Sequence, residues 1–87
     1  SYTANFALSH VVIRGNNLCG ITEDPKCDVT KTQQHLDDLF RQNSFKGMTF
    51  KIFTEPGKYT ERLQQLQKLE KSGQEAEMLQ LVGNLSL

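Results

Sequence analysis

Hydrophobic and polar residues alternate from Tyr2 to Arg14, the longest stretch of the chain with a period of two. Tyr2, Ala4, Phe6, Leu8, His10 and Val12 fall on one side, and the residues between them fall on the other. This period predicts a strand. From Leu8 onward both sides become mainly apolar, so we expect the second half to lie centrally in a sheet and to be covered on both faces.

The next segment has weaker signals. Gly15, Asn16 and Asn17 are typical turn residues because glycine and asparagine tolerate positive φ. Residues 18–29 show no clear period and contain glycine, proline and two adjacent carboxylates. We interpret them as an ordered loop or a short excursion at the edge of the sheet.

Residues 30–42 have the spacing of an amphipathic helix. Leu36, Leu39 and Phe40 form one apolar stripe, and Asp37 and Arg41 form an i,i+4 pair on the solvent side. Thr30, with Gln33 three residues later, matches a capping box, and Asp28 is the alternative N-cap. Residues 43–47 end this helix.

Alternation returns in residues 48–53, MTFKIF, which predicts a second strand. A strand, a helix and another strand form a βαβ unit, so we expect the strands over 2–14 and 48–53 to be parallel and joined by a right-handed crossover. Other strands can still lie between them.

A turn at residues 54–57 precedes a helix predicted over 59–71, with Tyr59, Leu63 and Leu66 at helical spacing and Ser72 and Gly73 as its stop. For the tail, Ser72 and Glu75 match a capping box and favour a helix with Met78, Leu79 and Val82 on its buried side. The alternative is a closing strand built on Leu79, Leu81 and Leu85, which would bring the sheet closer to a ferredoxin-like arrangement.

Together these elements predict one small α/β (or α+β) domain over residues 1–87. Its architecture is a βαβ-based two-layer domain with a C-terminal helical segment, and a ferredoxin-like arrangement is the alternative. A chain of 87 residues buries roughly 64% of its unfolded surface, which is enough for one modest core and too little for a deep, enclosed cavity.

Composition narrows the function classes. Ten basic and ten acidic residues balance, so no global field attracts the protein to nucleic acid or to a membrane. No apolar run approaches the roughly 18 residues of a membrane-spanning helix, and the first residues show neither the basic start nor the uninterrupted apolar stretch of a secretory signal. We expect a soluble, cytoplasmic protein.

Candidate catalytic and metal-binding residues are few. Cys19 and Cys27 are eight positions apart, which is not the spacing of a C-x-x-C motif; two reduced thiols are the favoured interpretation, and a disulfide or a Cys2His2 site with the two histidines are the alternatives. Cys27 and His35 with an aspartate give the one arrangement of nucleophile and base, and nothing in the sequence brings them together. We therefore expect no enzyme activity, no metal and no cofactor.

Charge is distributed unevenly along the chain. Residues 46–71 contain six basic and three acidic residues, whereas the segments 15–45 and 72–87 are each net acidic. The basic residues are Lys46, Lys51, Lys58, Arg62, Lys68 and Lys71, and Phe50, Phe53 and Tyr59 lie among them. This combination indicates a nucleic-acid-binding surface as the alternative function.

The leading hypothesis is a non-enzymatic protein-binding module, acting as an adaptor, inhibitor or regulatory subunit. Its basis is a leucine stripe that two strands do not fully cover. The predicted partner-binding residues are Tyr59, Arg62, Leu63, Leu66 and Leu69. The partner is another protein or a second copy of this chain, so a homodimer is one of the expected forms.

Overall fold

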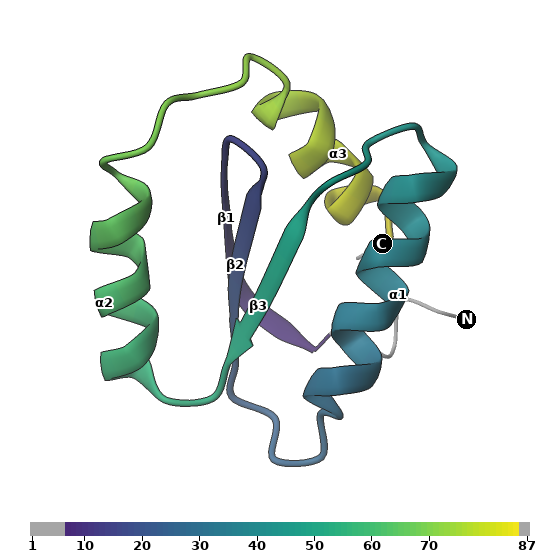
Figure 1. Ribbon diagram of the computed structural model, residues 1–87. Helices are drawn as coiled ribbons and strands as arrows, with labels where there is room; N and C mark the ends of the chain where they lie inside the picture. The colour runs from purple at the N-terminus through teal and green to yellow at the C-terminus, as the bar shows by residue number, and fades with distance from the viewer. Residues whose placement is uncertain (1–6, 86–87) are drawn as a thin grey trace.

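The computed structural model describes residues 7–85, and residues 2–6 of the predicted strand lie outside this range. Three strands and three helices follow one another (Figure 1). They are β1 (Leu8–Arg14), β2 (Asn17–Thr22), α1 (Val29–Gln42), β3 (Thr49–Phe53), α2 (Pro56–Leu66) and α3 (Glu75–Leu85). The α+β class and the C-terminal helix are thereby confirmed.

The sheet has the order β1-β2-β3, with β1 antiparallel and β3 parallel to β2. The βαβ unit is therefore β2–α1–β3, and two of our expectations were wrong: β1 is an edge strand, and it runs opposite to β3. The central strand lies where the sequence indicated a loop. Its Gly20 interrupts the hydrophobic pattern because a Cβ there would lie only 3.0 Å from Cδ1 of Ile52.

Helices cover both faces of the sheet, so the domain has three layers where we expected two (Figure 1). On one face, α1 and α3 bury Leu18, Leu36, Phe40, Ile52, Met78 and Val82. On the other face, α2 packs through Tyr59 and Leu66 against Cys19 and Ile21. Apolar residues of β2 point to both faces of the sheet: Leu18 lies on the first face, and Cys19 and Ile21 lie on the second. The second face therefore needs a helix of its own to cover them.

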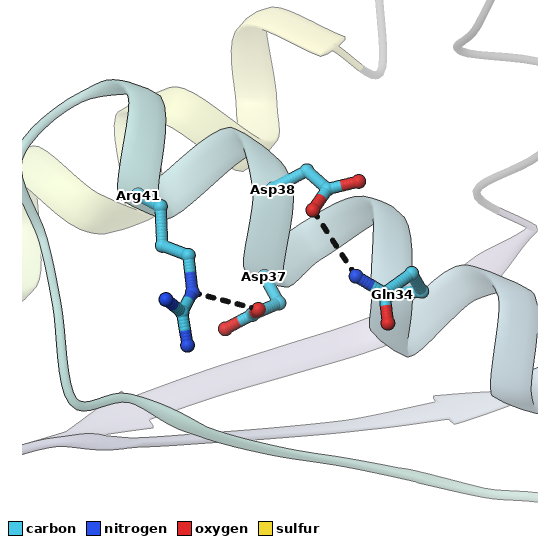
Figure 2. A network of polar contacts seen from close by, with 4 residues as sticks. All are labelled: Gln34, Asp37, Asp38 and Arg41. Atoms are coloured by element: carbon cyan, nitrogen blue, oxygen red, sulfur yellow. Dashed lines mark hydrogen bonds and ion pairs between the residues drawn. The ribbon is translucent and has the colours of Figure 1, made fainter.

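Helix α1 follows the prediction in most details. Leu36 and Phe40 are fully buried, and the Phe40 ring meets the Phe50 ring edge-on with centroids 5.1 Å apart. The N-cap is Asp28 and not Thr30, because its carboxylate accepts from the Lys31 N–H at 3.0 Å. The predicted pair of Asp37 and Arg41 forms at 2.8 Å (Figure 2).

Helix α2 ends at Leu66, five residues earlier than predicted. The chain then leaves the α-helix through short turns, and the Arg14 side chain donates to the carbonyls of Gln67 and Leu69 at 3.2 and 2.8 Å. These carbonyls therefore accept hydrogen bonds from a side chain of β1, and not from later N–H groups of a continuing helix. Residues 67–74 pass the end of the β1–β2 hairpin and bring the chain to the other face of the sheet (Figure 1).

Helix α3 confirms the helical interpretation of the tail. The Glu75 carboxylate accepts from the Ser72 N–H at 2.6 Å and from the Gly15 N–H at 2.8 Å, which fixes the start of α3 against the hairpin. Met78 and Val82 are buried as predicted, but Leu79 is 47% exposed because it lies outside the contact face. With residues 75–85 helical, the closing strand of the ferredoxin-like alternative does not form.

Candidate functional site

Helix α2 lies against a sheet face that is wider than the helix. Strand register puts Val12 and Arg14 of β1, Cys19 of β2, and Lys51 and Phe53 of β3 on this face. Helix α2 lies mainly over β2, and a groove lies on each side of it, one bordered by β1 and the other by β3. These two grooves differ in chemistry.

The β1–α2 groove is mainly apolar and has a volume of about 140 Å³. Its lining residues are Val12, Arg14, Leu63, Leu66 and Gln67. The Val12 side chain is 37% exposed, and Arg14 is the single charged residue of the lining. Two backbone carbonyls already bind the Arg14 guanidinium, so the rest of the groove offers a mainly apolar surface.

The two edge strands of the sheet differ in whether a side chain hydrogen-bonds to their backbone. At β3, the Ile52 N–H donates to Oε1 of Gln33 on α1 at 3.0 Å, so a side chain occupies the edge. At β1, no side chain of residues 7–83 hydrogen-bonds to the backbone of Leu8–Arg14. An unprotected edge strand is a template for a further strand, and this edge borders the β1–α2 groove.

The β3–α2 groove is cationic and has a volume of about 290 Å³. It is lined by Lys51, Phe53, Lys58, Glu61, Arg62 and Gln65. Arg62 is half-buried and held by two side-chain acceptors: Nη1 donates to Gln65 Oε1 at 2.9 Å, and Nη2 donates to Asn17 Oδ1 at 3.2 Å. Lys58 lies 3.0 Å from Glu55 at the start of α2.

The positive charges of the β3–α2 groove act on the pKa of the Cys19 thiol, which lies beneath α2. Burial raises the pKa of Cys19, and the positive charges of Arg62 and Lys51 partly oppose this rise. Burial also raises the pKa of Tyr59, and the neighbouring Cys19 adds to the effect. Both groups thus stay neutral near pH 7, and among residues 7–83 Arg62 and Lys51 have no anionic partner beneath the helix.

The predicted partner-binding residues do not form one surface. Tyr59 and Leu66 are 9% and 1% exposed and belong to the core, although Leu66 borders the β1–α2 groove. Leu63 lines the same groove, Leu69 is 40% exposed in the segment after α2, and Arg62 lies on the opposite side of the helix. The helix therefore divides the set between two grooves.

The six basic residues of the alternative hypothesis are also divided. Lys51, Lys58 and Arg62 line the β3–α2 groove. The other three, Lys46, Lys68 and Lys71, are exposed in the segments before β3 and after α2 and do not line it. Phe53 joins the first set, whereas Phe50 packs against the core on the other face.

A third depression, of about 570 Å³, contains the residues of the catalytic hypothesis. Its lining includes Cys27, Asp28 and His35. The Asp28 carboxylate serves as the cap of α1, and the Cys27 sulfur lies 3.5 Å from the Thr32 hydroxyl. The structure thus brings these residues to one place without joining the thiol to a base.

Cys19 and Cys27 are both free thiols. Asp37 and Asp38 point to different partners, Arg41 and Gln34, along the surface of α1 (Figure 2). Within the described part of the chain, no cluster of three metal-ligating side chains is found. In the same part of the chain, no helix is long and apolar enough to cross a membrane.

Val12, which lines the β1–α2 groove, and Gln33, which binds the β3 edge, are not among the predicted site residues. The sequence pattern predicts Val12 in a covered central strand and Gln33 in a helix cap. The signal for Gln33 was its position three residues ahead of the buried Leu36, on the side of α1 that faces β3.

No known family model, curated protein or solved structure matches this chain.

Proposed function

We propose that this chain is a non-enzymatic protein-binding module, and that an extended segment of its partner pairs with β1 and inserts an apolar side chain into the β1–α2 groove. The observation that carries this proposal is the contrast between the two sheet edges. Gln33 occupies the β3 edge, while the β1 edge has no such side chain among residues 7–83. In strand addition, backbone hydrogen bonds supply affinity and side-chain pockets supply specificity.

The apolar lining of the β1–α2 groove indicates which partner segments would bind there. Val12 and Leu63 form an apolar surface, and Arg14 is bound to carbonyls of the same chain. A segment with apolar residues at every second position would place one of them against Val12 and keep its polar residues in water. The zero net charge of the chain adds no long-range repulsion toward a partner of either sign. An adaptor, inhibitor or regulatory subunit would use such a surface.

The test uses a phage-displayed library of random peptides, selected on the purified chain. We expect the enriched peptides to alternate apolar and polar residues, and binding to Val12→Lys to weaken by about tenfold or more, because the ammonium group opposes an apolar side chain in the groove. Leu79→Lys is the matched control, since it places the same change at another exposed apolar residue. Circular dichroism verifies that both variants fold.

Several outcomes would contradict the proposal. Peptides without alternation, or peptides that bind wild type and Val12→Lys equally, would exclude strand addition at β1. Light scattering supplies a further test: dimers that Val12→Lys dissociates and Leu79→Lys leaves intact would assign the β1 edge to a second copy of this chain and not to a different protein.

A further inference from the structure

The β3–α2 groove combines positive charge with an aromatic ring. Lys51 and Arg62 form no ion pair with any described residue, and Glu61 is the single carboxylate among the lining residues. Lys58 adds a third cation, partly neutralised by Glu55. The groove therefore keeps an excess of positive charge although the whole chain is neutral.

Arg62 is oriented before any ligand arrives. Its two hydrogen bonds to Gln65 and Asn17 fix the guanidinium plane beside β2, at 2.9 and 3.2 Å. A guanidinium has five N–H donors, so these two bonds leave three of them unused. A fixed planar fork of this kind suits the oxygens of a phosphate group.

The aromatic ring belongs to Phe53, at the end of β3. Its centroid lies 6.3 Å from that of Tyr59 in an edge-on arrangement, so a buried ring supports it from the side of α2. Phe53 is half-buried and lines the groove together with Lys51. Aromatic rings next to basic side chains stack bases while the cations hold phosphates.

We propose that the β3–α2 groove binds single-stranded nucleic acid, with phosphates at Lys51, Arg62 and Lys58 and one base stacked on Phe53. The groove volume of about 290 Å³ is at the lower end of ligand sites, which span roughly 300–1,000 Å³. It accommodates a short part of the strand, and the remainder extends over the surface. This site lies on the opposite side of α2 from the β1–α2 groove and is independent of the proposed protein-binding function.

The experiment measures fluorescence anisotropy of a labelled single-stranded oligonucleotide with the full chain. We expect the double variant Lys51→Glu/Arg62→Glu to bind at least about tenfold more weakly. The matched control, Lys46→Glu/Lys71→Glu, changes the net charge equally away from the groove, and we expect a loss below about threefold. Lys51→Glu alone, at an exposed residue, keeps the test valid where the Arg62 change disturbs folding.

Salt dependence and stacking give two further readouts. Two or three phosphate contacts on a single strand predict that binding weakens by about 7- to 18-fold between about 50 and 200 mM salt. Phe53→Leu keeps apolar volume and removes the stacking surface, and the lower limit for one stacked base corresponds to about a fivefold loss.

Two results would contradict the proposal that the β3–α2 groove binds single-stranded nucleic acid. Equal losses in the two double variants would assign binding to diffuse charge and overturn the proposal. Binding that inorganic phosphate displaces and that Phe53→Leu leaves unchanged would reduce the groove to an anion site and overturn the nucleic-acid assignment. Val12→Lys should bind the oligonucleotide like wild type, so failure of one function is distinguishable from failure of the other.

Discussion

Replacing Gly15 by alanine should destabilise the domain through two separable effects. Gly15 opens the two-residue turn between β1 and β2 with φ of 58°, and its added Cβ would lie 3.0 Å from the carbonyl oxygen of Glu70. That oxygen cannot easily retreat, because the Arg14 side chain holds the neighbouring carbonyls of Gln67 and Leu69. The substitution therefore combines an unfavourable backbone conformation with a backbone contact.

The chain contains a control for the first effect. Gly47 has φ of 74°, but a Cβ there would meet nothing within 4 Å. A left-handed conformation costs an L-residue about 1–2 kcal/mol, and the stiffer unfolded chain returns about 0.4–1 kcal/mol. Gly47→Ala should thus reduce the free energy of unfolding by about 1 kcal/mol. Overpacking adds about 1–3 kcal/mol, so Gly15→Ala should lose about 2–4 kcal/mol.

Urea unfolding followed by circular dichroism measures both variants against wild type. A domain of this size loses about 4–8 °C in Tm for each kcal/mol, so thermal unfolding provides a second measurement. Equal losses for Gly15→Ala and Gly47→Ala would refute the close contact between the hairpin turn and the carbonyl of residue 70.

The remaining predictions concern the starts of two helices. The N–H groups of Ser72 and Gly15 donate to Glu75 and lower its pKa from 4.5 to about 2, so this carboxylate stabilises the fold fully above about pH 4.5 and loses its effect as the pH falls toward 2. Glu75→Gln should flatten this part of the pH dependence in urea unfolding, and an unchanged profile would contradict the assignment. Asp28→Ala should cost about 1 kcal/mol through the lost cap of α1, whereas Asp28→Asn should stay within a few tenths; equal thermal shifts for the two variants would show that charge, and not the hydrogen bond, acts there.

The helices were predictable because their signals are local. The stripe of Leu36 and Phe40 fixed the buried side of α1, and Ser72 with Glu75 marked the start of α3. The end of α2 was not predictable, because Arg14, more than 50 residues away, supplies the donors that bind the carbonyls after Leu66. No window of the sequence around residue 67 contains that information.

The sheet was harder to predict for a related reason. Apolar residues on both sides of β1 suggested a central strand, but α3 covers only the side of Val11 and Ile13, while Val12 on the other side borders a groove. In β2, Gly20 leaves room for the side chain of Ile52 on the neighbouring strand β3. This contact joins two strands that are distant in the sequence. Both candidate sites depend on this arrangement, since each groove joins one side of α2 to a different outer strand.

The link between Gly15 and Glu75 also has a consequence for the order of folding. It joins residues 60 positions apart, whereas the β1–β2 hairpin closes over two residues and the β2–α1–β3 unit over a few tens. Closing a longer loop costs more chain entropy, so we expect the hairpin and the βαβ unit to form before α3 docks. On the ribosome, Val11 and Ile13 remain in contact with water until residues 75–85 have been synthesised, and this interval is when a nascent chain is most exposed to aggregation.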